Sequence, residues 1–149
     1  MSFLITGGAS QVGSVIAQLL KDAHQNVIIG SRSGRVPEGF QSTKLDWLDP
    51  STFQNPFKLP GVEIKSVYLL LPYGHVDPSE NIKQFIDIAV SNEVKRFVLL
   101  SGSGHEKGAD FGISKVWRYL DEKRLDYIAL RPTWFIGMNL FPSTSISQI

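Results

Sequence analysis

Residues 1–14 read MSFLITGGASQVGS, a short apolar run followed by a glycine-rich turn and the beginning of a helix. Residues 3–5 have the length and composition of a buried parallel strand. Gly7 lets the backbone approach a ligand without a Cβ atom in the way, and Gly13 lets the helix lie close to the strand. Free N–H groups at the start of a helix attract an anion, so this stretch predicts a cradle for a pyrophosphate.

The glycine spacing leaves a second interpretation open. Ser10 stands where the usual dinucleotide-binding pattern has its middle glycine, so the same residues also fit a plain strand-to-helix turn that binds nothing. The position of the turn, at the start of an alternating pattern of strands and helices, favours the cradle.

The composition narrows the kind of partner. The chain has 149 residues, 42% hydrophobic and 19% charged, which predicts one domain, residues 1–149, with a substantial core. A net charge of +1 gives no strong field for nucleic acid or an anionic membrane, so we expect a small-molecule partner.

The sequence has no cysteine, which excludes disulfides and thiol chemistry. With no leader segment and no bilayer-spanning apolar run, we expect a cytoplasmic protein, and the oligomeric state is left open.

Apolar runs and helical stripes alternate along the chain. The expected strands are residues 3–5, 27–29, 42–45, 67–71, 97–100 and 127–130. The expected helices contain the apolar stripes at 12–20, 82–90 and 113–120, the first running to about His24, and a short helix begins at Asp49-Pro50 and is cut off by Pro56. This alternation predicts an α/β fold, a doubly wound parallel sheet of the Rossmann type with strand order 3-2-1-4-5-6 and with residues 67–71 at its centre. Residues 142–149 are rich in serine and are expected to be loose.

Ligands of such sheets bind outside the carboxyl ends of the strands, where the strand order reverses. In this chain that point lies between the first and fourth strands. Four loops are expected to converge there, at residues 7–13, 31–35, 71–74 and 101–104. Their convergence is a stronger indication of a ligand site than one glycine turn.

The loop after the second strand predicts which dinucleotide is bound. In NAD-selective folds an acidic residue at this place binds the ribose 2′-hydroxyl, whereas this chain has Ser31-Arg32-Ser33. The predicted cofactor is therefore NADP, with Arg32 pairing with the 2′-phosphate, Ser31 or Ser33 donating a hydroxyl and Arg35 near enough to help. The alternative is a solvated basic turn.

Asp46, at the end of the third strand, also has two interpretations. Its carboxylate is placed to accept a hydrogen bond from the adenine amino group. Alternatively, it begins a turn together with Asp49-Pro50, because aspartates are common at helix starts.

Several segments together resemble a known family. They are Ile5-Thr6-Gly7-Gly8 with Gly13, Ser31-Arg32, Leu71-Pro72, Lys95-Arg96 before residues 97–101, and residues 130–135, which read LRPTWF. With them the chain resembles an atypical short-chain dehydrogenase/reductase of the NmrA-like group, and within it the fungal ergot-alkaloid reductases, the festuclavine and agroclavine dehydrogenases. The resemblance covers nearly the whole chain. It implies an NADP-dependent oxidoreductase that transfers a hydride to a small-molecule acceptor of alkaloid biosynthesis.

The same resemblance implies roles for individual residues. The pyrophosphate would be lined by Gly7, Gly8, Ser10, Gln11, Val12 and Gly13. Leu71 and Pro72 would lie on the ribose and nicotinamide side, and Ser101 on the substrate side. Lys115 matches the lysine of the family's Y-x-x-x-K pair, the alternative being a plain surface lysine.

One family residue is missing, because Phe111 stands where the tyrosine of that pair would be. Phenylalanine cannot deliver a proton to an alkoxide, so ketone reduction by the tyrosine route is disfavoured. An iminium acceptor escapes the difficulty, because hydride addition to C=N⁺ leaves a neutral amine. The catalytic residues are left unassigned.

Two other functions remain open at this stage. The NmrA-like group includes redox-state regulators without the tyrosine, so a non-catalytic NADP-binding sensor is the first alternative. Family members also continue into a substrate-capping region that we expect to be largely absent here, so an inactive fragment is the second.

The three histidines and two large aromatic residues complete the candidates. His24 ends a helix and His105 lies in a loop, and neither has a metal-ligand spacing, so no metal is expected. His75, three residues after Pro72, is expected near the nicotinamide as an acid or a substrate contact. Phe85 and Trp117 lie at helical spacing and are expected in the core.

Overall fold

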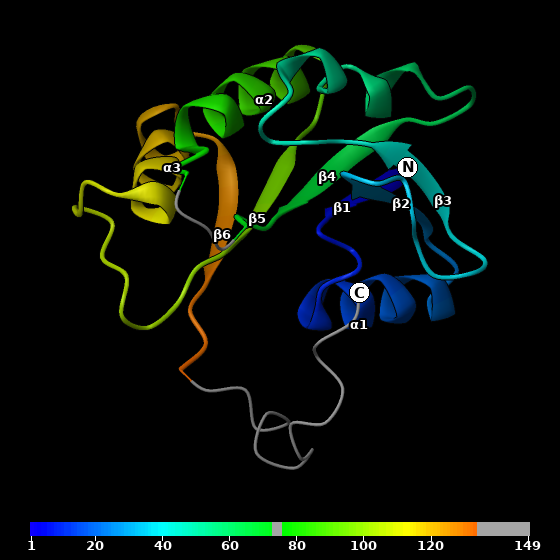
Figure 1. Ribbon diagram of the computed structural model, residues 1–149, viewed down its shortest axis with the longest axis horizontal. Helices are drawn as coiled ribbons and strands as arrows, with labels where there is room; N and C mark the ends of the chain where they lie inside the picture. The colour runs from blue at the N-terminus through cyan, green and yellow to red at the C-terminus, as the bar shows by residue number, and fades with distance from the viewer. Residues whose placement is uncertain (73–75, 134–149) are drawn as a thin grey trace.

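The computed structural model describes residues 1–72 and 76–133, which form one parallel sheet with helices on both faces. The strands lie in the order β3-β2-β1-β4-β5-β6 (Figure 1). Their bounds are β1 Ser2–Thr6, β2 Asn26–Ser31, β3 Gln41–Lys44, β4 Ile64–Leu69, β5 Arg96–Leu100 and β6 Asp126–Leu130. The predicted fold class and strand order are confirmed, with β4 at the centre of the sheet as expected.

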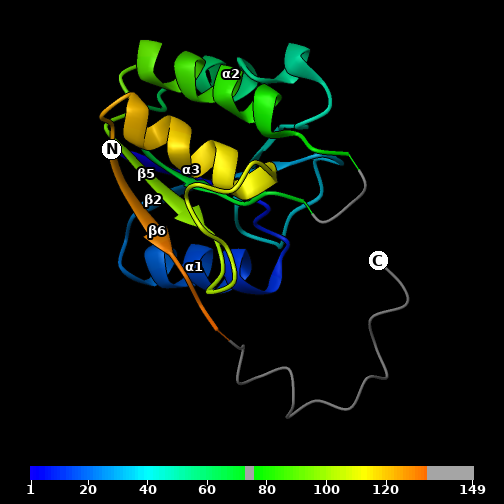
Figure 2. The same cartoon turned by 90° about the vertical axis from the view of Figure 1, so that its left-hand side faces the viewer.

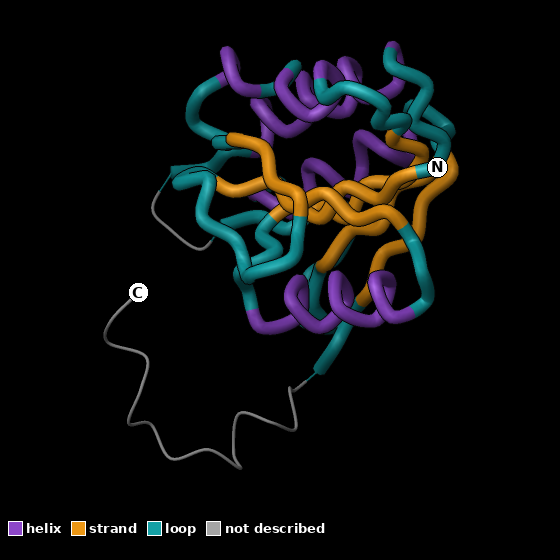
Figure 3. Tube along the Cα trace, turned by 90° about the vertical axis from the view of Figure 1, so that its right-hand side faces the viewer, coloured by secondary structure: helices purple, strands orange, loops and turns teal. Residues whose placement is uncertain are grey.

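Three α-helices cover the sheet: α1 Gln11–Asp22, α2 Ser79–Ser91 and α3 Gly112–Glu122. Helices α2 and α3 lie side by side on one face, and α1 lies alone on the other (Figures 1 and 2). Seen along the sheet, the strands form a middle layer between the two layers of helix (Figure 3). From β1 to β3 the chain adds strands towards one edge of the sheet, and from β4 to β6 it adds them towards the other edge. Because each crossover is right-handed, helices that belong to the two directions lie on opposite faces.

Each face of the sheet has its own core. The core beneath α2 and α3 is the larger and contains an aromatic group, in which the ring of Phe85 lies 5.2 Å from that of Trp47 and 5.9 Å from that of Phe53. The prediction that Phe85 is a core residue is confirmed. Trp117 is only half-buried, because its indole N–H donates a hydrogen bond of 3.2 Å to the hydroxyl of Tyr127 near the surface.

The segment after β3 differs from the prediction of one short helix ended by Pro56. It forms two 3-10 turns, Pro50–Thr52 and Asn55–Lys58. Pro56 is buried in the first turn of the second element, where a missing N–H costs nothing, so this proline begins a turn.

The end of β4 also differs, because the strand stops at Leu69 and not at residue 71. The hydroxyl of Thr6 takes the place of the next backbone pair. It donates to the carbonyl oxygen of Tyr68 at 2.8 Å and accepts from the N–H of Leu70 at 2.9 Å. A buried side chain therefore completes the ladder at the switch point of the sheet.

All three α-helices end in the same way, with a non-glycine residue in the left-handed region. These residues are His24, Glu93 and Arg124, with φ of 57°, 63° and 54°. In each case the N–H of the following residue bonds to a carbonyl five positions earlier, at 2.9, 3.0 and 3.1 Å. This is the Schellman arrangement that turns a helix into the next strand. Helix α1 accordingly ends at Asp22, two residues before the predicted end at His24.

Candidate functional site

A cleft of about 490 Å³ opens at the carboxyl ends of β1, β2 and β3. Its walls are the segments 6–9, 30–33 and 45–48, together with Leu70, Pro72 and Val76. Three of the four expected loops thus contribute to one cavity. The fourth, residues 101–104, lies outside the cleft wall.

The glycine turn forms the floor of this cleft. Gly7 has a φ of +64°, and the N–H of Ser10 donates to its carbonyl oxygen at 2.8 Å. The hydroxyl of Ser10 caps α1 by accepting from the N–H of Gly13 at 3.1 Å. The turn therefore joins the end of β1 directly to the capped start of α1.

Gly8 and Gly13 have no room for a Cβ atom. A Cβ atom on Gly8 would lie 2.5 Å from Cγ2 of Ile29 on β2. One on Gly13 would lie 2.5 Å from the carbonyl oxygen of Gly7 and 2.9 Å from the Ser10 hydroxyl. The close approach expected for Gly13 is real, but its partner is the turn before the helix. Gly7 and Gly8 bring backbone without side chains to the cleft, which suits the close approach of a pyrophosphate.

The structure divides the predicted pyrophosphate residues into two groups. Gly7 and Gly8 line the cleft. The residues that do not line it are Ser10, Gln11, Val12 and Gly13. Ser10 is occupied as the helix cap, and Val12 packs into the core beneath α1. Their contact with a ligand stays a prediction.

Ser31, Arg32 and Ser33 line the opposite wall. The two serine hydroxyls lie 3.4 Å apart, and Arg32 is exposed and forms no ion pair with any described residue. Its guanidinium is therefore free to bind an anion. Arg35 does not line the cleft, and its backbone N–H donates to the hydroxyl of Ser33 at 3.3 Å.

Asp46 lies in the third wall and begins a turn there. Its carboxylate accepts from the N–H of Leu48 at 3.0 Å, while Asp49 caps the following 3-10 turn by accepting from the N–H of Ser51 at 3.1 Å. The turn interpretation is thus correct. The adenine interpretation stays a prediction, since Asp46 also faces the cleft.

Apolar residues of this wall were missed from the sequence. Trp47 and Leu48 line the cleft, and the Trp47 indole N–H donates to the carbonyl oxygen of Leu70 at 3.0 Å. The amide of Asn81 on α2 also holds the Trp47 carbonyl, at 2.7 Å. One feature of the sequence indicates Trp47 as a cleft residue: it follows the predicted third strand directly, and ligands bind at the carboxyl ends of such strands.

The edge beyond β4 and β5 holds the remaining candidates. Leu71 packs against the core beneath α2 and α3. The Nζ atom of Lys115 lies 3.2 Å from a carboxylate oxygen of Asp77, so this lysine is a fixed ion-pair partner. Partial burial acts to raise the pKa of Asp77, but hydrogen bonds from the Ser79 N–H and from Lys115 outweigh it, and the pKa lies below its usual value.

Phe111 is half exposed at the residue before α3, and its ring centroid lies 5.3 Å from that of His105. The N–H of Ser101 donates to the carbonyl oxygen of Leu130 at 2.8 Å, while its hydroxyl is buried and has no partner in the described part of the chain. His75 lies outside the described residues, so its expected role is not placed.

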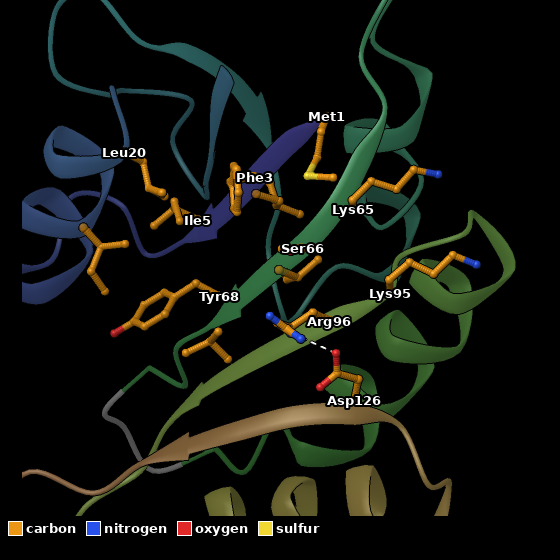
Figure 4. A pocket seen from close by; sticks show the side chains of 14 residues that line it. Met1, Phe3, Ile5, Leu20, Lys65, Ser66, Tyr68, Lys95, Arg96 and Asp126 are labelled. Carbon is orange, nitrogen blue, oxygen red and sulfur yellow. Dashed lines mark hydrogen bonds and ion pairs between the residues drawn. The ribbon is translucent and has the colours of Figure 1, made fainter. Parts of the chain in front are cut away.

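A second hollow, of about 610 Å³, lies on the sheet face beside α1 (Figure 4). Phe3 and Ile5 of β1 and Tyr68 of β4 point into it, and Lys95 and Arg96 lie at the amino-terminal end of β5. Burial raises the pKa of Tyr68 to about 12, and its hydroxyl has no partner among the residues described. Because this hollow follows the face and the amino-terminal ends of the strands, it is not where a Rossmann sheet holds a dinucleotide.

Two kinds of feature are absent from residues 1–72 and 76–133. No three histidine, aspartate or glutamate side chains there lie together as metal ligands would. None of the helices there has the length and apolar character needed to cross a bilayer.

Curated proteins similar to this chain include fungal festuclavine and agroclavine enzymes. Agroclavine dehydrogenase of Claviceps fusiformis is 39% identical over 138 residues, which cover 91% of the chain and 47% of that protein. Festuclavine synthase II of Penicillium roqueforti is 36% identical over 141 residues, covering 91% of the chain and 48% of that protein. The similarity expected from the sequence is thus confirmed. The chain spans about half the length of the curated relatives it matches.

Solved structures support the fold. Triphenylmethane reductase of Citrobacter sp., complexed with NADP(H), superposes with a TM-score of 0.70 at 16% identity and covers 93% of this chain and 52% of its own. A short-chain dehydrogenase/reductase superfamily protein of Agrobacterium tumefaciens with bound NAD gives 0.66 at 17% identity, covering 88% and 48%. No family model matches the chain.

Proposed function

We propose that this chain is the dinucleotide-binding part of an oxidoreductase that uses NADP(H) and reduces a small-molecule acceptor. The observation that carries the proposal is the cleft itself, in which the glycine turn with Gly7 and Gly8 faces a loop of serine and arginine. The solved neighbours with bound NAD and NADP(H) support a nicotinamide dinucleotide in this cleft.

The preference for NADP(H) rests on Arg32. An exposed guanidinium without an ion pair among the described residues, beside two hydroxyls, suits a doubly charged phosphate. No carboxylate follows β2 to accept from a ribose 2′-hydroxyl, which is what an NAD-selective site uses.

The acceptor we propose is an iminium of the indole-alkaloid class. The names of the fungal relatives support the class. When bound, the reduced cofactor supplies a hydride, and an iminium then needs no proton from the protein. Phe111 has no proton to give and Lys115 is paired with Asp77, so these two positions favour such an acceptor over a ketone.

A non-catalytic NADP-binding sensor is the second candidate function. It is favoured by the same two observations, Phe111 before α3 and the Lys115–Asp77 ion pair, because a sensor needs the cleft but no proton donor.

Titration of the purified chain with NADPH and NADH tests the cofactor, and loss of NADPH absorbance with a matched iminium and ketone tests the chemistry. We expect tighter binding of NADPH and faster turnover of the iminium. Phe111→Tyr should raise ketone reduction, by up to about 10²- to 10⁴-fold. Equal affinities would contradict the NADP assignment. Faster ketone turnover by the unmutated chain would contradict the acceptor, and binding without turnover would select the sensor.

A further inference from the structure

Helix α1 carries more apolar surface than the sheet covers. Ala17 is fully buried in the core beneath the helix. Ile16 and Leu20 line the hollow beside the helix, and Leu20 is labelled there in Figure 4. Val15 and Leu19 lie further round the helix and are 56% and 63% exposed. At about 100° per residue, the middle of this apolar arc faces the hollow and not the sheet, so the sequence of α1 is that of a helix with a second apolar neighbour.

Val15 and Leu19 form a ridge next to the hollow, which we call the α1 ridge. The two residues are four positions apart, so they lie one turn apart along the outside of the helix. The hollow has a volume of about 610 Å³, and Phe3, Ile5 and Val98 are among the residues that line it. One face of the molecule thus holds a raised and a hollowed apolar surface side by side. Such a face is complementary to itself, because a two-fold rotation exchanges the two parts.

The direction of the two-fold axis follows from this placement. Helix α1 and the hollow lie side by side across the strands, so an axis parallel to the strands brings the ridge of each copy over the hollow of the other. An axis that runs across the strands would bring ridge onto ridge and would leave the lining of both hollows without contacts. Of the two arrangements, only the first fills the hollows.

The end of α1 carries a negative charge beside the ridge. Asp22 is the last residue of the helix, is exposed, and follows Val15 by seven positions, so it lies on the same side as the ridge. Lys21 lies on the other side, with its Nζ atom 4.6 Å from the centroid of the Phe40 ring. The carbonyl groups at a helix end add partial negative charge. Because β2 begins at Asn26, this end of α1 is level with the amino-terminal ends of the strands.

The amino-terminal rim of the hollow carries the matching positive charge. Lys95 comes directly before β5, lines the hollow, is exposed and forms no ion pair with any described residue. Its neighbour Arg96 is already paired with Asp126, at 2.8 Å. An axis parallel to the strands keeps the strand ends of both copies at the same level, so Asp22 of one copy comes to the rim that carries Lys95 in the other. The charges therefore favour the same arrangement as the shapes.

We propose that this face joins two copies of the chain, with the α1 ridge of each copy seated in the hollow of the other. The net charge of +1 per chain gives little repulsion between the copies. The cleft lies at the carboxyl ends of the strands, so the pairing leaves it open and does not rest on the proposed function. Because each copy contributes a small ridge, the dimer belongs to the weak, reversible class, with a dissociation constant on the order of 10–100 µM.

Sedimentation equilibrium of the full chain, from about 1 µM to about 1 mM, tests the pairing. The mass should rise with concentration to that of two chains and no further, because a two-fold contact closes on itself. Leu19→Gln should raise the dissociation constant at least about tenfold, since it brings a polar amide into an apolar hollow. The Leu19 side chain is largely exposed in the single chain, so the circular dichroism spectrum should stay the same. Val90→Gln is the matched control, because Val90 is 40% exposed on α2, on the other face of the sheet.

Exchange of the two charges tests the direction of the axis. Asp22→Lys and Lys95→Glu each place like charges at both symmetric contacts, so each should weaken the dimer about fivefold at low salt. The double variant restores opposite charges at both contacts. Its dissociation constant should return to within about twofold of that of the unmutated chain, which independent effects of the two substitutions would not produce.

Each result bears on a separate step of the proposal. A chain that stays single at every concentration would overturn it, and another part of the chain or another protein would then cover the hollow. A dimer that Leu19→Gln leaves unchanged would place the contact on a different face and would contradict the proposal equally. A dimer that Leu19→Gln weakens, but that the double charge exchange does not restore, would rule out the axis parallel to the strands.

Discussion

Leu70 and Thr6 are joined by a hydrogen bond of 2.9 Å in which the Leu70 N–H donates to the Thr6 hydroxyl. The same hydroxyl donates to the carbonyl oxygen of Tyr68 at 2.8 Å, and Thr6 is only 2% exposed. Both backbone groups lie where β1 and β4 separate towards the cleft. A side chain therefore satisfies two groups that the diverging strands can no longer satisfy for each other.

Replacing this hydroxyl gives the first prediction. Thr6→Val keeps the shape but leaves the Leu70 N–H and the Tyr68 carbonyl without their partner, so the free energy of unfolding should fall by about 1–3 kcal/mol. Denaturant unfolding followed by circular dichroism measures the change. Thr6→Ser retains the hydroxyl and should lose much less, and equal losses in the two variants would assign the effect to packing.

Gly13 gives the second prediction. In Gly13→Ala the new Cβ atom must displace the carbonyl oxygen of Gly7, which lies 2.5 Å from its place, so the cradle changes shape. We expect a loss of about 1–3 kcal/mol of stability and weaker NADPH binding with the far-ultraviolet spectrum retained. Gly108→Ala is the control, because nothing lies within 4 Å of the added atom. Unchanged NADPH affinity in Gly13→Ala would return the turn to a purely structural role.

Arg32 gives the third prediction, on cofactor choice. Arg32→Ala should weaken NADPH binding by roughly 1.5–3 kcal/mol, because a charge-assisted pair with the 2′-phosphate is lost. NADH has no such phosphate, so its affinity should hardly change. Calorimetric titration with both cofactors measures the difference. Arg35→Ala is a matched control, since Arg35 belongs to the same loop but does not line the cleft. A similar loss in both variants would mean that only the net charge of the loop matters.

Arg124 gives the fourth prediction, on stability alone. Its φ of 54° is costly for a residue with a Cβ atom, and its side chain forms no ion pair within residues 1–72 and 76–133. Arg124→Gly should raise the free energy of unfolding by up to about 1 kcal/mol. The substitution relieves the strain of the left-handed conformation, and the greater conformational entropy of glycine in the unfolded chain offsets part of this gain. Arg124→Ala should give no gain. Glu93 is a poorer site for the same change, since its carboxylate lies 3.3 Å from Lys65.

The sequence predicts the sheet well because its signals are local. Apolar runs bounded by glycine and proline identify the strands, and handedness then leaves one order for them. The predictions are wrong where a residue far away in the sequence determines the local structure. The end of β4 depends on the hydroxyl of Thr6, far away in the chain, and Pro56 begins a turn whose next residue, Phe57, stacks on Phe85 of the core.

The candidate site divides in the same way. Gly7, Arg32 and Asp46 follow directly from strand ends, and all three line the cleft. Trp47 and Leu70 were missed because each reads as core, and only the tertiary structure turns part of them towards the cavity. The partner of Lys115 was equally invisible, since Asp77 precedes α2 and no sequence pattern links the two residues.

The face of the sheet that carries only α1 among the described helices leaves apolar side chains of β4, β5 and β6 exposed to solvent. Tyr68 pairs in register with Val98, and Val98 with Ile128, so a row of apolar side chains crosses β4, β5 and β6 on this face. Ile128 is 50% exposed and Leu130 39%, and α1 is the one helix that the described residues place on this face (Figure 1). An exposed apolar surface of this kind favours association with other apolar surfaces in water. We therefore expect the chain to self-associate at high concentration, to adsorb to plastic, and to bind anilinonaphthalene sulfonate with bright fluorescence while the fold remains intact.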